Sequence, residues 1–266
     1  MGLHDFNSEF YSTESASFFF NSSFGLGPEI SQTGPSIFPT SSLAARIRVE
    51  PASSFYLETG VWDGIPGNPD DATGTHIMLN RNDGLFIASE MGYLVGKEKD
   101  SKSKPGRYAL GLWTYTHTSD HLSKTYVDGS GNTTSISEKG VSNGFYLMAD
   151  QGLTDHLSIF AKYGFTTPQY NQIAWNLNGG ILMSGVIPGR DDDKLGLGVT
   201  VAKNGSEYLA ANPTSLGSEM TYELSYRFEF GRGLALQPDL QYVVHPGMVA
   251  GVDNAWVGAA RFEIAF

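Results

Sequence analysis

The last twelve residues, "AWVGAARFEIAF" (255–266), alternate large apolar residues with small or polar ones. One parity carries the large apolar side chains of Trp256, Phe262, Ile264 and Phe266, and the other carries Arg261 and Glu263. Because successive side chains of a β-strand point to opposite faces of the sheet, this stretch predicts a strand with one apolar and one polar face. The apolar face must meet an apolar environment.

Ten further segments show the same period of two, and no segment shows a helical stripe. Eight alternate cleanly, at 42–50, 55–63, 107–115, 156–163, 172–183, 194–202, 220–230 and 233–244, and two less so, at 84–95 and 144–153. With the C-terminal segment, about eleven strands are expected. Most are longer than the five or six residues that are usual in soluble sheets. Their length suits a tilted strand that crosses a bilayer.

Charged residues gather on one face of these strands. The charged face carries Arg46, Arg48, Glu58, Glu90, Lys162, Glu223, Arg227, Glu229, Asp239 and Arg261, and the other face carries almost none. A β-sandwich has shorter strands, and a soluble lipocalin-type barrel has eight strands and an apolar interior. The pattern therefore favours an all-β, antiparallel, up-and-down transmembrane barrel with lipid outside and water inside.

The predicted connections alternate in length. Short turns are expected at 50–54, 152–155 and 231–233, and long loops rich in Gly, Asn, Asp, Ser and Thr at 63–83, 117–141 and 203–218. Outer-membrane barrels have short periplasmic turns and long extracellular loops. The connections 96–106 and 164–171 are exceptions in length.

Composition excludes several classes of function. The 266 residues carry a formal net charge of −11, which argues against nucleic acid as a partner. There is no cysteine, so neither a disulfide framework nor a cysteine-based zinc site is available. Mean hydropathy is −0.20, and no stretch reaches the length of an apolar membrane-spanning helix. Residues 1–10 have neither a basic region nor an apolar core, so no signal peptide is visible.

Four stretches resemble the carbohydrate-selective porin family of the OprB type. They are "FFFNSSFGLGPE" (18–29), "GVWDGIPGNP" (60–69), "LQPDLQYVVHPG" (236–247) and the terminal "ARFEIAF" (260–266), in the family's order and over most of the chain. The resemblance implies a sixteen-stranded outer-membrane barrel that passes sugars such as glucose by diffusion. It also implies that Phe266 is read by the barrel assembly machinery. Lipopolysaccharide, membrane lipid and other copies of the chain are further expected partners.

The inward parity supplies candidate residues for sugar recognition. Aromatic rings stack on the C–H faces of a sugar, and charged groups bind its hydroxyls. The candidate pore-lining residues are Arg46, Arg48, Tyr56, Glu58, Trp62, Glu90, Trp113 and Tyr115, with Tyr146 as a further candidate ring. The alternative is that these charges only solvate a water-filled lumen. No cofactor is expected.

Other constellations are weaker. "HTSDH" (117–121) and "RDDDK" (190–194) read as loop and turn sequences rather than metal sites, and "HPG" (245–247) as a turn. No nucleophile, base and orienting residue lie close in sequence. A structural or adhesion barrel and, more remotely, an outer-membrane hydrolase remain the alternative functions.

The start of the chain raises a question of barrel closure. If the C-terminal strand runs toward the periplasm, a strand must precede the strand at 42–50, and "FYSTESASFFF" (10–20) is the available segment. Residues 21–41 then form an extracellular or inward-folded loop. This gives about twelve strands in a single barrel domain over 1–266. The family has sixteen strands, so we expect the first strands to be missing and a gap between the first and last strands of this chain. The alternative is a smaller barrel that closes by pairing residues 10–20 with residues 255–266.

Overall fold

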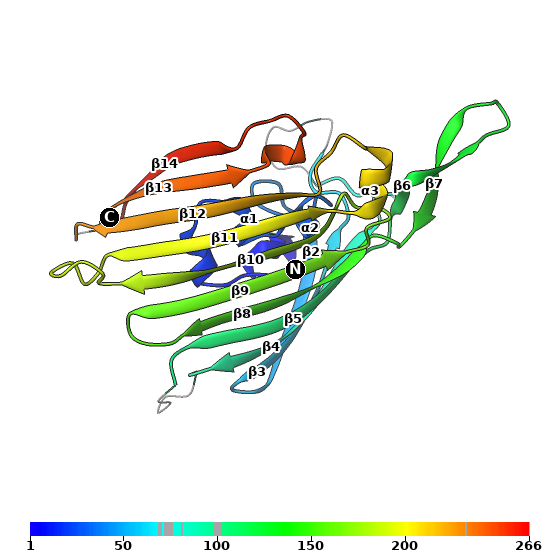
Figure 1. Cartoon of the computed structure of the whole chain (residues 1–266). Helices are drawn as coiled ribbons and strands as arrows, with labels where there is room; N and C mark the ends of the chain where they lie inside the picture. The colour runs from blue at the N-terminus through cyan, green and yellow to red at the C-terminus, as the bar shows by residue number, and fades with distance from the viewer. Residues whose placement is uncertain (69–70, 72–76, 81, 98–102, 232, 266) are drawn as a thin grey trace.

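The computed structural model describes residues 1–68, 71, 77–80, 82–97, 103–231 and 233–265. In this part of the chain, twelve strands form one strongly curved antiparallel sheet in the order β1-β2-β3-β4-β5-β8-β9-β10-β11-β12-β13-β14 (Figure 1). The strands are β1 (Gly2–His4), β2 (Ser42–Ala52), β3 (Phe55–Asp63), β4 (Leu85–Val95), β5 (Gly106–Tyr115), β8 (Asn143–Gly152), β9 (Leu157–Thr166), β10 (Ile173–Ser184), β11 (Lys194–Asn204), β12 (Ser218–Glu229), β13 (Leu234–Val244) and β14 (Ala255–Ile264).

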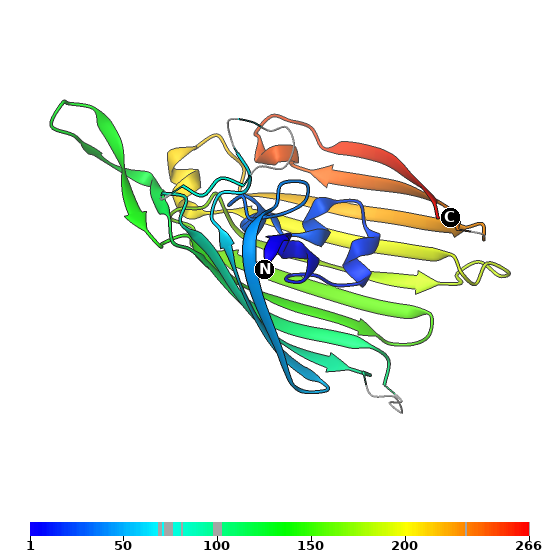
Figure 2. The ribbon, with the colours of Figure 1, turned by 180° about the vertical axis from the view of Figure 1, so that it is seen from behind.

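The remaining elements lie at the rim of the sheet or inside its curve. A separate hairpin, β6 (Thr118–Val127) and β7 (Thr133–Lys139), projects beyond the rim, and α3 (Ser206–Ala211) and η3 (Pro246–Met248) lie in the other long connections. Residues 5–37, called the inner segment below, contain η1 (Phe6–Ser8), η2 (Ser15–Phe18), α1 (Ser22–Gly25) and α2 (Pro28–Ser31). Figure 2 shows the inner segment lying in the concave face of the sheet.

The eleven long strands agree with the predicted ones. Their faces also agree: Leu57 and Val199 point outward and are exposed, whereas Glu58 and Thr200, one position further along, are buried on the concave face. Exposed apolar side chains cover the convex face of most strands. Such a surface is unfavourable in water but suits hydrocarbon.

The prediction of a strand at residues 10–20 is wrong. Only β1, three residues long, precedes β2, and residues 10–20 form the 3-10 turn η2 and irregular backbone. The reason is visible in the burial pattern. Phe10 and Tyr11 are both buried, as are Phe18 and Phe19, and a strand cannot place two neighbouring side chains on one face.

The sheet ends at β1 and β2 on one side and at β14 on the other. Among the described residues, no strand pairing joins residues 10–20 to β14. No helix in the described part of the chain is long and apolar enough to cross a membrane.

Candidate functional site

Neighbouring strands bring three of the predicted charged residues into register on the concave face. Arg48 of β2 lies opposite Glu58 of β3, and Glu58 lies opposite Glu90 of β4. Arg46 Nη1 donates to Glu58 Oε2 at 3.0 Å, and Arg48 Nη1 approaches the same oxygen at 3.5 Å. The glutamate is fully covered, while a quarter of each arginine side chain remains exposed. These residues form a ladder of charged side chains at the β2 side of the sheet.

Tyr56 and Arg107 extend this ladder. Arg107 Nε donates to the Tyr56 hydroxyl at 2.8 Å, and Arg107 Nη2 donates to Glu90 Oε1 at 2.6 Å. The Tyr56 hydroxyl in turn donates to Glu90 Oε1. Arg107 was not among the predicted pore-lining residues, although it shares the inward parity of Trp113 and Tyr115 on β5. As the charged residue of β5, on the same face as these two aromatic residues, Arg107 could have been predicted to line the pore.

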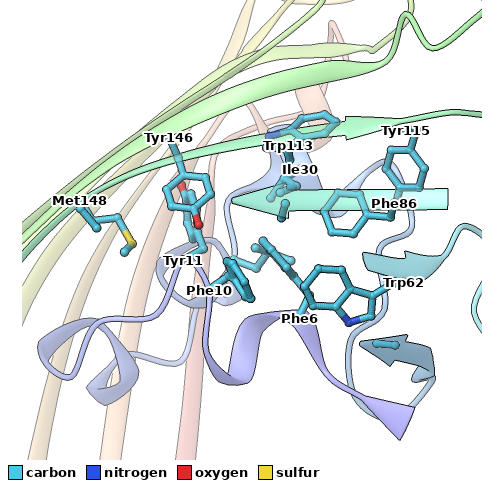
Figure 3. Close-up of a cluster of buried hydrophobic side chains, with 14 residues drawn as sticks. Phe6, Phe10, Tyr11, Ile30, Trp62, Phe86, Trp113, Tyr115, Tyr146 and Met148 are labelled. Carbon is cyan, nitrogen blue, oxygen red and sulfur yellow. The ribbon is translucent and has the colours of Figure 1, made fainter. Parts of the chain in front are cut away.

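The predicted aromatic residues point inward but are not open to a ligand. Trp62, Trp113 and Tyr115 form one buried cluster with Phe6 and other residues of the inner segment (Figure 3). The Trp62 ring meets the Phe6 ring edge-on at 5.6 Å. Each of these predicted rings, and Tyr56 and Tyr146 as well, is at most 3% exposed. Their expected role as free stacking surfaces is therefore corrected. Trp62, Trp113, Tyr115 and Tyr146 pack in the cluster that includes Phe6 and Tyr11 of the inner segment, whereas Tyr56 contacts Arg48, Arg107 and Glu90.

Inward-facing carboxylates bind backbone N–H groups of the inner segment. Glu90 Oε2 accepts from the Tyr11 N–H at 3.2 Å, and Asp150 Oδ2 accepts from the Ser15 N–H at 2.8 Å. Glu223 accepts from two consecutive N–H groups, those of Phe20 at 2.6 Å and Asn21 at 3.0 Å. Hydrogen bonds to charged acceptors are stronger than neutral ones. The buried carboxylates therefore hold irregular backbone that has no strand partner of its own.

Inward-facing donors bind the carbonyl groups of the same segment. Lys162 Nζ donates to Gly25 O at 2.8 Å, and Arg107 Nη2 donates to Glu9 O at 3.0 Å. Asn178 and Gln237 reach the carbonyls of Ser23 and Phe18 at 2.9 Å. Sequence reasoning expected charges on this face to meet water, and many of them meet backbone instead. A pattern of alternation cannot distinguish the two, because both require an inward polar residue.

The inner segment does not cover the concave face completely. At the ladder, Arg46 also pairs with Glu9 of the inner segment at 3.3 Å, and both side chains are partly exposed. Beneath η2, toward the short connections, lies a cavity of about 870 Å³. Its lining includes Ser12, Glu14, Lys97, Arg107, Asp150 and Lys194. The cavity is lined by apolar side chains such as Leu94, Leu157 and Leu182 as well as by these polar and charged ones.

The described residues hold no cluster of three side chains that could bind a metal ion. In the "HTSDH" stretch, His121 is buried and its Nδ1 accepts the N–H groups of Ser123 and Lys124, which caps a local turn. In "RDDDK", Asp193 pairs with Arg190 and accepts the Tyr226 hydroxyl at 2.8 Å. Both stretches have structural roles in their loops. Phe266 lies outside the described residues, as do parts of the connections 63–83 and 96–106 and Arg232.

A curved antiparallel sheet with an apolar convex face and a charged concave face has the architecture of the wall of an outer-membrane β-barrel protein. The chain belongs to a particular family of such proteins: the carbohydrate-selective porin, OprB family, matches residues 1–266.

Individual relatives agree with this assignment. Porin B of Pseudomonas aeruginosa is 26% identical over 261 residues, which cover 86% of this chain and 56% of the relative. The high-pH structure of Pseudomonas putida OprB superposes with a TM-score of 0.71 at 23% identity, over 86% of this chain and 60% of that one. The outer membrane channel DcaP of Acinetobacter baumannii shares the fold at 7% identity, with a TM-score of 0.53 over 84% of this chain and 62% of that one. The chain spans just over half the length of Porin B.

Proposed function

We propose that the whole protein is an outer-membrane porin that lets sugars, monosaccharides such as glucose among them, diffuse passively through a polar channel. The observation that carries the proposal is the ladder of Arg46, Arg48, Glu58, Glu90 and Arg107 on the concave face of a sheet whose convex face is apolar. Membership of the carbohydrate-selective porin family supports the same conclusion.

The ladder has chemistry that suits a neutral sugar. Guanidinium groups offer several N–H donors in a fixed plane, and carboxylates offer acceptors, so adjacent hydroxyls of a sugar ring find both. The exposed quarter of the Arg46 and Arg48 side chains is available for such contacts. Because arginines and glutamates pair with one another here, the empty site has no large net charge that would require a charged solute.

A passive channel needs no catalytic group, and we propose that the protein is not an enzyme. The further proposed partners are outer-membrane lipid and lipopolysaccharide on the convex face, the barrel assembly machinery at Phe266, and other copies of the chain. We also propose that residues 1–266 belong to a single barrel domain. None of these needs a nucleic acid, which the net charge of −11 disfavours.

A structural or adhesion barrel is the second candidate, because the inner segment covers much of the concave face. Conductance of the whole protein in a planar bilayer, with and without glucose, distinguishes the two. A porin gives stable open-channel conductance that falls as glucose is added. A closed barrel that conducts nothing would favour the structural role.

A further inference from the structure

A buried carboxyl group lies between the inner segment and the sheet. Glu29, on α2, is 1% exposed. Its side chain occupies the space left by two glycines: an added Cβ at Gly164 of β9 would lie 1.7 Å from Glu29 Oε1, and one at Gly27 would lie 2.2 Å from Oε2. The socket for this side chain therefore exists only because both positions lack a side chain.

The socket gives the carboxyl group little compensation for a negative charge. Glu29 Oε2 is buried, and neither this oxygen nor the buried hydroxyl of Tyr11 has a partner in full hydrogen-bond geometry. The two groups lie close enough to affect each other's ionisation, and their contact only partly offsets the cost of burial. Lys162 of β9 is the nearest cation, but its Nζ donates to the carbonyls of Gly25 and Tyr11 and forms no ion pair with Glu29. A buried charge without a paired partner is strongly unfavourable.

The other groups around the socket do not change this balance. β10 contributes the neutral amides Asn176, which lies opposite Gly164, and Asn178, which lies opposite Lys162. The charge of Asp150 on β8 attracts the Lys162 ammonium group, and the charge of Arg107 on β5 repels it, so the two effects oppose each other. The charged groups that face Glu29 itself are thus Lys162 and the ionisable hydroxyl of Tyr11.

We propose that Glu29 is a proton-binding site that holds the inner segment on the sheet while it is protonated, and that loss of the proton loosens the segment. This site would bind a proton rather than a sugar, and it lies outside the charged ladder.

The ionisation of Glu29 supports this assignment. Burial raises the pKa of Glu29 from its ordinary value of 4.5 to about 7, against the smaller opposing effects of its own backbone N–H, the nearby Tyr11 hydroxyl and Lys162. In the released segment the pKa returns toward its ordinary value, so the docked state binds the proton more tightly. Docking is therefore strongest below the ordinary pKa and weakens as the pH rises through about 7. The full effect on the docking equilibrium is on the order of 100-fold.

The position of the socket connects it to the channel surface. Gly164 lies opposite Tyr146 of β8, whose hydroxyl donates to Glu90 Oε2 at 2.6 Å, and the Tyr11 N–H donates to the same oxygen. Loosening α2 and Tyr11 thus removes one partner of the ladder residue Glu90. For its effect on sugar passage the inference rests on the proposed function, but the docking itself does not.

Thiol accessibility in the whole protein measures the docking directly. The chain has no cysteine, so Ala16→Cys, at a position in η2 that is 1% exposed, introduces a single buried thiol. Ser17→Cys introduces an exposed one next to it. The rate at which the buried thiol reacts with a water-soluble maleimide is divided by the rate for the exposed thiol. This ratio cancels the effect of pH on the ionisation of the thiols. We expect this ratio to rise at least tenfold between pH 5 and pH 9, and to stay low and flat when Glu29→Gln is added.

Glu14→Gln, which neutralises an exposed glutamate of the same segment, should leave the rise unchanged. A flat ratio in the protein with Glu29 intact would overturn the proposal, and so would an equal rise with Glu29→Gln. The first result needs no Glu29 variant, so it holds even if that variant does not fold. If the ratio rises but no sugar passes at any pH, the proton site stands and the proposed function fails.

Discussion

The guanidinium carbon of Arg48 lies 3.9 Å from the centre of the Tyr56 ring, and the hydroxyl of the same tyrosine contacts Arg107 and Glu90. One side chain therefore positions two arginines from two different strands. Stacking on an aromatic face contributes about 0.5–2 kcal/mol and fixes the plane of the guanidinium. The Tyr56 ring lies over Gly92 of β4, where an added Cβ would come within 2.1 Å of ring atoms.

We expect Gly92→Ala to displace the Tyr56 ring and release Arg48 from it. The open-channel conductance and the glucose concentration for half-block should both change, by about threefold or more if the stack contributes about 1 kcal/mol. Gly258→Ala is the matched control, since a Cβ there meets no atom within 4 Å. Equal conductance and equal glucose block of the two variants in planar bilayers would show that stacking of Arg48 on Tyr56 does not affect the channel.

The ladder arginines make a second test. Replacing Arg46 and Arg48 with alanine removes two cations beside Glu58 and should shift the reversal potential in a salt gradient toward cation selectivity, with conductance and glucose block changing together. Lys139→Ala, which removes an exposed cation from the projecting hairpin, should change neither. If the double variant behaves like the control, these arginines are ordinary lumen charges.

Docking of the inner segment depends on its aromatic side chains. Phe6 is fully buried, 5.1 Å from the Phe86 ring and 5.6 Å from the Trp62 ring. We expect Phe6→Ala to weaken docking by about 3–5 kcal/mol, seen as faster protease cleavage within residues 5–37. Phe38→Ala, at an exposed position just beyond the segment, should change the free energy of docking by no more than about 0.5 kcal/mol and leave the cleavage rate nearly unchanged. Unchanged cleavage in Phe6→Ala would show that the aromatic cluster does not hold the segment.

Sidedness of the strands can be read by labelling. Single cysteines at Leu57 and Val199 should react with a lipid-phase reagent, and cysteines at Glu58 and Thr200 should not, because the two pairs lie on opposite faces of the sheet. Tyr226 and Arg227 form a third pair on β12 with the same expected parity. The reverse labelling pattern would place the apolar face inside and indicate a soluble barrel.

The wall of the barrel was predictable from the sequence, whereas the inner segment was not. Alternation over 55–63 and 194–202 gave the strands and faces correctly, because a strand that separates lipid from a polar interior must alternate. Residues 10–20 lack this signal. Their structure depends on contacts with remote residues, such as Ser15 with Asp150, which no local pattern contains.

The candidate site was predictable in its residue types but not in its accessibility. Arg46, Arg48 and Glu58 meet as expected from adjacent strands, since register follows from short turns. Trp62 and Trp113 were placed on the correct face, but nothing in their own strands indicated that a distant segment would cover them. Burial by a non-local segment is a tertiary property, and period-two patterning reports only which face a residue occupies.

The central claim, passive sugar diffusion, is tested most directly by liposomes that contain the whole protein and no energy source. We expect labelled glucose to equilibrate across the membrane at a rate proportional to the amount of protein, without nucleotide or ion gradient, and unlabelled glucose inside to exchange freely. Uptake that requires an ion gradient, or liposomes that remain impermeable to glucose while the protein is inserted and folded, would contradict the account.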